Sequence, residues 1–380
     1  MRAASAMFAL LTVSVLGTAA AAPVVDAVVV AARVGDTGPA SNAAAVARKD
    51  QQVTLFAAAR LVGRDRVWVT RAPALVLGGR RVKVVSPEAA GLDGAALRWS
   101  TVEPVPAHVG ADGVPEPYSN AQLGGQNHGA WKGYDQLGYF ETVLGDFAQG
   151  GWTRAGSARP PRPADDTWDG MGTMRFKVEL RVGDRLLASA GAEATDQRGL
   201  LGRVARVTVR WDDSFLGWLS SYFMVPEVFG SAGPGRDHQT DRYVGADCAD
   251  VLVGALRASG SKVDYTSAAG LTRLTRHVAG PFAADARGVL SAVATGKQVA
   301  SVAVAAGDIV LIRYAGPWAT GTGRAWDHVG ALWEDRGVKG VLDGEDLIVH
   351  MGHPRLEIEP LSAQSPAVFD VLRWDGKKIR

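Results

Sequence analysis

Cysteine is nearly absent from this chain of 380 residues, which contains one, Cys248. A single cysteine cannot form a disulfide within its own chain. It is therefore a reactive thiol, a small buried apolar side chain or half of an intermolecular bridge. Composition alone does not separate these interpretations.

Other absences exclude whole classes of function. The formal net charge is +2 and no basic stripe is present, so no nucleic-acid partner is expected. The chain has no Gly-x-Ser-x-Gly elbow and no phosphate-binding Gly-x4-Gly-Lys loop. A catalytic zinc needs three protein ligands, and the pair His350-x-x-His353 is too small a set. We therefore expect neither a metal nor another cofactor.

The first 21 residues have the pattern of a signal peptide. Arg2 is followed by an apolar stretch at 6–16 and by three small residues at 19–21. An uncleaved anchor is the alternative, but the apolar stretch is about half of the ~20 residues that a membrane span needs. No later segment is apolar for 18 residues. We expect a secreted or periplasmic protein without stable membrane insertion.

The rest of the chain divides into three parts. Residues 22–49 are rich in alanine, valine and glycine and are expected to form a linker. Residues 50–212 contain short β-prone runs; residues 174–182, for example, alternate between apolar and polar before the turn Gly183-Asp184. These runs predict an all-β, sandwich-like domain.

Residues 213–380 have a different pattern. Helical spacing at about 215–223 and 249–258 is followed by strand-like runs at 308–314, 328–333, 347–351 and 367–372. Helices followed by strands predict an α+β domain with an antiparallel sheet.

Cys248 lies where the second of these helices begins. Asp247 is a favoured N-cap residue, which places the cysteine in the first helical turn. The positive end of the helix dipole there favours a thiolate, the nucleophilic form. The alternative is a cysteine that only packs the helix start, but the apolar stripe begins three residues later, at Val251, and Asp250 is polar.

Two histidines occupy strand positions downstream. His328 opens one expected strand and His350 ends the next, so paired strands would bring the imidazoles together as base and orienting group. Either histidine alone is more simply structural, but both together behind a helix-start cysteine favour catalysis. His353 could compete for the third role; strand alternation places it on the other face, so we prefer His350.

Several motifs resemble the NlpC-type family of papain-like cell-wall peptidases, in the order that this family has them. They are the Pro-Glu-Val-Phe-Gly-Ser approach segment at 226–231, Asp-Cys-Ala-Asp at 247–250, Ala-Gly-Asp-Ile-Val at 306–310, His-Val-Gly-Ala at 328–331, Ile-Val-His at 348–350 and the closing strand at 369–373. The resemblance covers roughly residues 214–380 and implies an α+β papain-like fold there. The sequence departs from the family pattern at Asp250, at Glu227 and in an insertion at 334–346.

The resemblance also implies roles. Cys248 would be the nucleophile, His328 the base and His350 the polar third member, with the backbone N–H of Cys248 in the oxyanion hole. Tyr243 and His238, in the loop before the cysteine, could line the cleft or be ordinary loop residues. The implied reaction is hydrolysis of an amide through a thioester, usually in a peptidoglycan stem peptide.

Three functions remain open from the sequence. The first is a secreted cysteine peptidase or amidase acting on cell-wall peptides, with the N-terminal β domain used for targeting or scaffolding. The second is an acyltransferase or deamidase with the same core and another substrate. The third is a non-enzymatic binding protein with a vestigial peptidase core, against which the intact Cys-His-His set argues.

Overall fold

A computed structural model describes residues 23–63, 66–106, 118–119, 137–156, 170–196, 198–232, 238–299, 303–315, 325–352 and 354–374. The predicted signal peptide and His353 lie outside the described residues. In the part of the chain that is described, no helix combines the length and apolar character required to cross a membrane.

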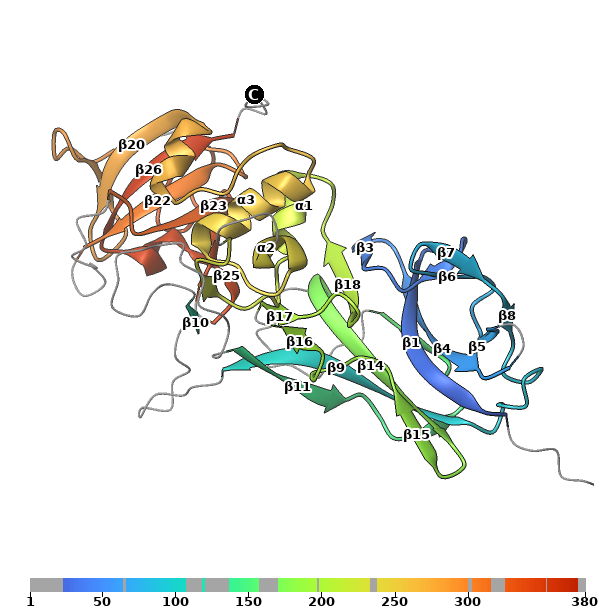
Figure 1. The fold of residues 1–380 in the computed structure, drawn as a ribbon. Helices are drawn as coiled ribbons and strands as arrows, with labels where there is room; N and C mark the ends of the chain where they lie inside the picture. The colour runs from blue at the N-terminus through green and yellow to red at the C-terminus, as the bar shows by residue number, and fades with distance from the viewer. Residues whose placement is uncertain are drawn as a thin grey trace, which may run out of the picture.

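The first eight strands belong largely to one curved sheet. β1 (Val25–Val34) pairs antiparallel with β4 (Val53–Leu61) along its whole length. The sheet has eight strands and curls into a nearly closed, barrel-like shape (Figure 1). Its other members are β2 (Ala40–Ser41), β5 (Trp68–Thr70), β6 (Leu75–Leu77), β7 (Arg80–Val82), β8 (Val84–Val85) and β13 (Thr153–Ala155).

A second sheet packs against the first. Its main strands, in spatial order, are β11 (Leu137–Val143), β9 (Ala96–Pro106), β14 (Gly172–Val182), β18 (Ala205–Arg210) and β3 (Ala45–Arg48). Two short strands extend it, β12 (Ala148–Gln149) and β15 (Arg185–Ala188), and β16 (Thr195–Asp196) pairs with β17 (Gly199–Leu200) nearby. Trp99, Trp152 and Phe176 fill the core between the two sheets.

The predicted linker at 22–49 is wrong, because this segment contains β1, β2 and β3. Its small apolar residues alternate in burial, and Val28 and Val30 pack into the core shared by the two sheets. Alanine and valine here build strands rather than a flexible lead-in.

The C-terminal region, residues 211–374, is built on one antiparallel sheet of seven strands. Its order is β21 (Leu290–Ala292), β20 (Arg276–Ala284), β26 (Ala367–Arg373), β22 (Ile309–Tyr314), β23 (His328–Glu334), β24 (Leu347–Met351) and β25 (Leu356–Pro360). The helical elements are α1 (Phe215–Ser220), α2 (Gln239–Arg242), α3 (Cys248–Ala258) and the 3₁₀ turns η1 (Ala269–Arg273) and η3 (Leu361–Gln364). A two-stranded pair, β10 (Tyr118–Ser119) with β19 (Val228–Phe229), joins this region to the N-terminal part.

The expected fold class, an α+β papain-like domain behind a sandwich-like domain, is wrong. Strands account for 46% of the residues and helices for 11%, and the described residues contain three α-helices. The N-terminal part forms a barrel-like sheet in place of a simple sandwich. The sheet explains the difference. Ile309 and Leu311 face α3, whereas Val310 and Ile312 face a second core closed by side chains such as Leu342 and Leu361. Loops and turns bury that second face, so no layer of helices is needed there.

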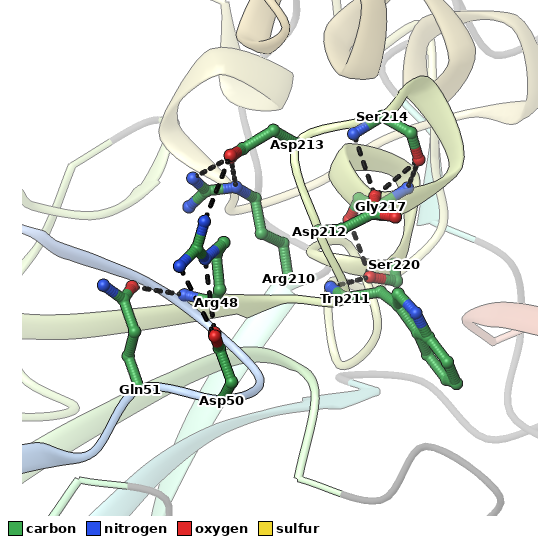
Figure 2. Close-up of polar contacts among 10 residues, drawn as sticks. All are labelled: Arg48, Asp50, Gln51, Arg210, Trp211, Asp212, Asp213, Ser214, Gly217 and Ser220. Atoms are coloured by element: carbon green, nitrogen blue, oxygen red, sulfur yellow. Dashed lines mark hydrogen bonds and ion pairs between the residues drawn. The ribbon is translucent and has the colours of Figure 1, made fainter.

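A network of polar contacts fixes the junction between the two regions (Figure 2). Arg210, at the end of β18, and Arg48, at the end of β3, both contact Asp213. Ser214 caps α1 by accepting from the Gly217 amide at 3.0 Å. Gly217 is required there, since a Cβ would lie 2.1 Å from Asp212 Oδ1. The chain therefore enters the C-terminal region in a defined direction.

A buried arginine of the N-terminal strands supports the segment that leads to Cys248. Arg175, on β14, donates from Nη2 to the carbonyl of Tyr243 at 2.5 Å and to that of Arg242 at 3.3 Å. Arg206, on β18, donates to the same Arg242 carbonyl at 2.9 Å. These carbonyls belong to the end of α2, and such orphan groups need donors. Burial lowers the pKa of Arg175 to about 10, so the guanidinium stays charged at neutral pH.

Replacing Arg373 by methionine should destabilise the C-terminal sheet. Arg373, on β26, makes a two-pronged ion pair with the buried Asp308 just before β22, with Nη2 to Oδ2 at 2.6 Å. Without the cation a buried carboxylate loses its partner, and the expected loss is about 2–3 kcal/mol because Arg373 itself is one-third exposed. Urea unfolding would measure it. Arg276→Met, the cross-strand neighbour of Arg373, is the control, and an equal loss there would contradict the assignment.

Candidate active site

Cys248 is the first residue of α3, as the sequence predicts. The Asp247 carboxylate caps the helix: Oδ1 accepts from the amides of Ala249 at 3.0 Å and Asp250 at 2.8 Å. Its Oδ2 accepts from the Gly230 amide at 3.1 Å, which ties the approach segment to the helix start. Among the described residues no acceptor binds the Cys248 amide, so this N–H is available to a developing oxyanion.

The environment of the thiol reverses the predicted shift of its pKa. Burial, followed by the negative charges of Asp247, Asp250 and Glu227, raises the pKa of Cys248 well above its ordinary value. The backbone N–H of Val329 opposes this by favouring the thiolate. The helix dipole is therefore outweighed, and the resting group is a thiol rather than a thiolate.

His328 and His350 are brought together. His328 begins β23, His350 lies in β24, and His328 Nε2 is 2.9 Å from His350 Nδ1. The two rings are nearly perpendicular, with centroids 5.0 Å apart. Gly330 is the direct cross-strand partner of His350, and a Cβ there would lie 3.0 Å from the His350 Cβ. The absence of that side chain lets the His350 ring lean diagonally toward His328.

The row continues onto a third strand that the sequence analysis did not consider. His350 Nε2 is 2.9 Å from Oε1 of Glu359 on β25. The side-chain amide of Gln364, in η3, donates to the same Glu359 oxygen, and the Tyr314 hydroxyl donates to the Gln364 oxygen. The ring of Tyr314 in turn stacks on His328 at a centroid distance of 6.0 Å. The only sequence signal for Glu359 is the alternation Leu-Glu-Ile-Glu at 356–359, which is typical of a half-exposed strand.

His328 is uncharged at neutral pH. Burial and the neighbouring His350 lower the pKa of His328 to about 3. With a thiol at Cys248 and a neutral imidazole at His328, the resting pair carries no net charge. His328 Nε2 contacts His350, so Nδ1 is its other ring nitrogen. The backbone N–H of the next residue, Val329, interacts with the Cys248 sulfur, which brings β23 close to the thiol.

A cavity of about 560 Å³ opens beside the thiol. Cys248 forms part of its wall together with carboxylates and aromatic rings. The carboxylates belong to Asp247, Asp250 and Asp327, and the rings to Phe229, Tyr265 and Trp326. Such a volume holds a few residues of a peptide, and its aromatic walls suit extended chains.

Asp250, which replaces a glycine of the family pattern, is a buried member of this wall. It accepts from the hydroxyl of Ser231 and from the amide of Ala232, both at 2.7 Å. Burial and the adjacent Asp247 raise the pKa of Asp250 well above its ordinary value. The side chain therefore positions the loop before the cysteine and adds negative charge near the sulfur only when ionised.

The remaining candidates from the sequence have separate places. Tyr243 is buried at the end of α2, stacked on Tyr222 at a centroid distance of 4.4 Å, and is a packing residue. His238 contacts the edge of Tyr265, a cavity wall residue. His350, Glu357 and Glu359 bring potential metal ligands within 4.8 Å of one another. Both nitrogens of His350 are already hydrogen-bonded, so a metal would have to displace Glu359 or His328.

No protein-family model matches this chain, and neither a curated protein nor a solved structure matches it. The likeness to the NlpC-type family therefore stays a prediction from motifs.

Alkylation should report the thiol at rest. We expect Cys248 to react with iodoacetamide more slowly than free cysteine at pH 7, and its rate to keep rising above pH 9, because its pKa is raised. The same protein in urea is the control and should show an ordinary thiol profile. A folded protein that reacts faster than free cysteine at pH 6 would contradict the neutral resting pair.

Removing one carboxylate near Cys248 should shift the pH profile of alkylation toward lower pH. Asp250→Asn is expected to accelerate alkylation about threefold where Asp250 is otherwise ionised, because a lower thiol pKa gives more thiolate of somewhat weaker nucleophilicity. Asp264→Asn, an exposed carboxylate in the following loop, is the matched control. Equal profiles for both variants would show that Asp250 does not act on the sulfur.

Proposed function

We propose that this protein is a cysteine hydrolase that cleaves an amide bond of a peptide, with Cys248 as nucleophile, His328 as base and His350 as the group that orients the base. The observation that carries the proposal is the 2.9 Å contact between His328 Nε2 and His350 Nδ1, on a strand whose next residue, Val329, interacts through its backbone N–H with the helix-start Cys248. A nucleophile, a base and a third group that orients the base form the minimal set for covalent hydrolysis.

The reaction follows from the neutral resting pair. As the sulfur of Cys248 attacks the carbonyl carbon of the amide, its proton passes to Nδ1 of His328. The negative oxygen is stabilised by the backbone N–H of Cys248. When the C–N bond breaks, His328 returns the proton to the leaving amine and a thioester remains. Water then attacks the thioester, again with His328 as base, and the acid product leaves the restored thiol.

The cavity supports a peptide substrate. Its aromatic rings offer flat apolar contacts, and its carboxylates disfavour a strongly anionic ligand at the nucleophile. The motif resemblance adds peptidoglycan stem peptides as the first substrate class to examine. We further propose that the protein acts outside the cytoplasm, because the first 21 residues have the composition of a signal peptide and a lone cysteine avoids unwanted disulfides there.

Digestion of purified peptidoglycan by the wild type and by Cys248→Ala tests the proposal. The wild type should release new amino and carboxyl groups in equal amounts, and Cys248→Ala should lose about 10³-fold or more in rate, because no other side chain takes over the nucleophile. Cys248→Ser, which keeps the size of the side chain, should be nearly as inactive. Unfolding of all three proteins in urea controls for a loss of structure.

The alternatives are outcomes of the same assay. Ammonia released without chain cleavage would indicate a deamidase, and product joined to an added amine would indicate an acyltransferase. Identical product profiles from wild type and Cys248→Ala, on peptidoglycan and on a panel of peptide amides, would remove the enzymatic assignment.

A further inference from the structure

Three neighbouring strands each contribute one side chain to a continuous row. His328 on β23, His350 on β24 and Glu359 on β25 are linked by two contacts of 2.9 Å. Neither contact is between direct cross-strand partners: His350 stands opposite Gly330 on one side and opposite Glu357 on the other. Diagonal neighbours on one face of a sheet are within reach of long side chains.

A carboxylate at the end of the row, together with a neutral His350, would fix the direction of every hydrogen bond in it. The bond with His350 lowers the pKa of Glu359, so Glu359 is a carboxylate at neutral pH and can only accept. His350 Nε2 must therefore carry a proton. In a neutral imidazole Nδ1 then holds a lone pair, which accepts from Nε2–H of His328. The proton of His328 is thus on Nε2, and Nδ1 is left as a base.

We infer that Glu359 is a positioning residue that sets the tautomers of His350 and His328, so that Nδ1 of His328 is free to take the proton of Cys248. The inference rests on the proposed hydrolase function and deepens it. Glu359 does not line the cavity beside Cys248; it acts through His350, as a carboxylate acts on the base of other nucleophile–histidine systems.

Glu359 is itself held in place. The side-chain amide of Gln364 donates to the Oε1 atom that His350 also uses, and the oxygen of Gln364 accepts from the Tyr314 hydroxyl. Gln364 is 8% exposed, and the His350 side chain 5%. Each donor and acceptor in this set has one role, so reversing one bond would leave another without a partner.

Three variants separate the contributions of Glu359. Glu359→Leu removes the acceptor, and we expect kcat to fall by about 10²-fold with KM within about threefold, because the base is then partly in the wrong tautomer. Glu359→Gln keeps an oxygen that can accept but loses the charge, and should fall less, by about tenfold. Glu345→Leu, an exposed glutamate in the turn before β24, is the control and should stay within about threefold of the wild type.

A spectroscopic readout separates this inference from the hydrolase proposal. With ¹⁵N-labelled histidine in a Cys248→Ala background at pH 7.5, the ring nitrogens of His328 and His350 should both show the Nε2–H tautomer. Glu359→Leu should mix the tautomers, while Glu345→Leu should not. Assignment uses His328→Gln and His350→Gln. No activity is needed for this measurement.

The outcomes distinguish the role of Glu359 from the hydrolase function. Unchanged tautomers and kcat in Glu359→Leu would overturn the role of Glu359, as would an equal effect of Glu345→Leu. A His350 protonated on both nitrogens at pH 7.5 would overturn it too, since His350 Nδ1 would then donate to His328. If the tautomers behave as expected but wild type and Cys248→Ala act alike on every substrate, the hydrolase proposal fails while the positioning remains.

Discussion

The contact between His328 Nε2 and His350 Nδ1 is the interaction on which the proposed chemistry depends, because its direction decides whether Nδ1 of His328 carries a proton or a lone pair. The bond exists only because β22 to β25 pair in one register. A slip of one residue between β23 and β24 would turn every side chain of one strand to the opposite face. The apolar side chains of these two strands oppose such a slip, since Val329, Ala331, Ile348 and Val349 are all fully buried. The packing of the sheet core therefore holds His328 and His350 in contact.

The sulfur is positioned from the opposite side, by the start of α3. Both carboxylate oxygens of Asp247 accept hydrogen bonds from backbone amides, which fixes the first turn of α3 and the Gly230 loop. The N-terminal strands contribute to this position, because Arg175 binds carbonyls at the end of α2. The role proposed from the sequence for the N-terminal β part was targeting or scaffolding, and these contacts support the scaffolding part of it.

The local features of the site were predictable and the non-local ones were not. An N-cap aspartate and the following apolar stripe place Cys248 correctly at the start of α3, and alternation finds the strands that carry His328 and His350. The sequence did not identify Glu359 as a site residue, because Leu-Glu-Ile-Glu is also the pattern of an ordinary half-exposed strand. Only the pairing of β25 with β24 brings Glu359 to His350. The predicted fold class was wrong for a related reason, since a sequence pattern does not show that loops cover the second face of the sheet. The predicted direction of the Cys248 pKa shift was wrong, because the sequence shows the helix start with its dipole but does not show the burial of the thiol.

A neutral resting pair places a specific demand on the rest of the site. In the proposed mechanism, moving the proton from Cys248 to His328 creates two opposite charges where burial disfavours both. Each charge therefore needs a partner already in place. On the sulfur side the negative charge passes to the substrate oxygen, which meets the free amide at the start of α3. On the imidazole side the positive charge is separated from the Glu359 carboxylate only by the His350 ring. The helix start and the third strand thus stabilise the two ends of one charge separation, which links the otherwise separate requirements on α3 and β25.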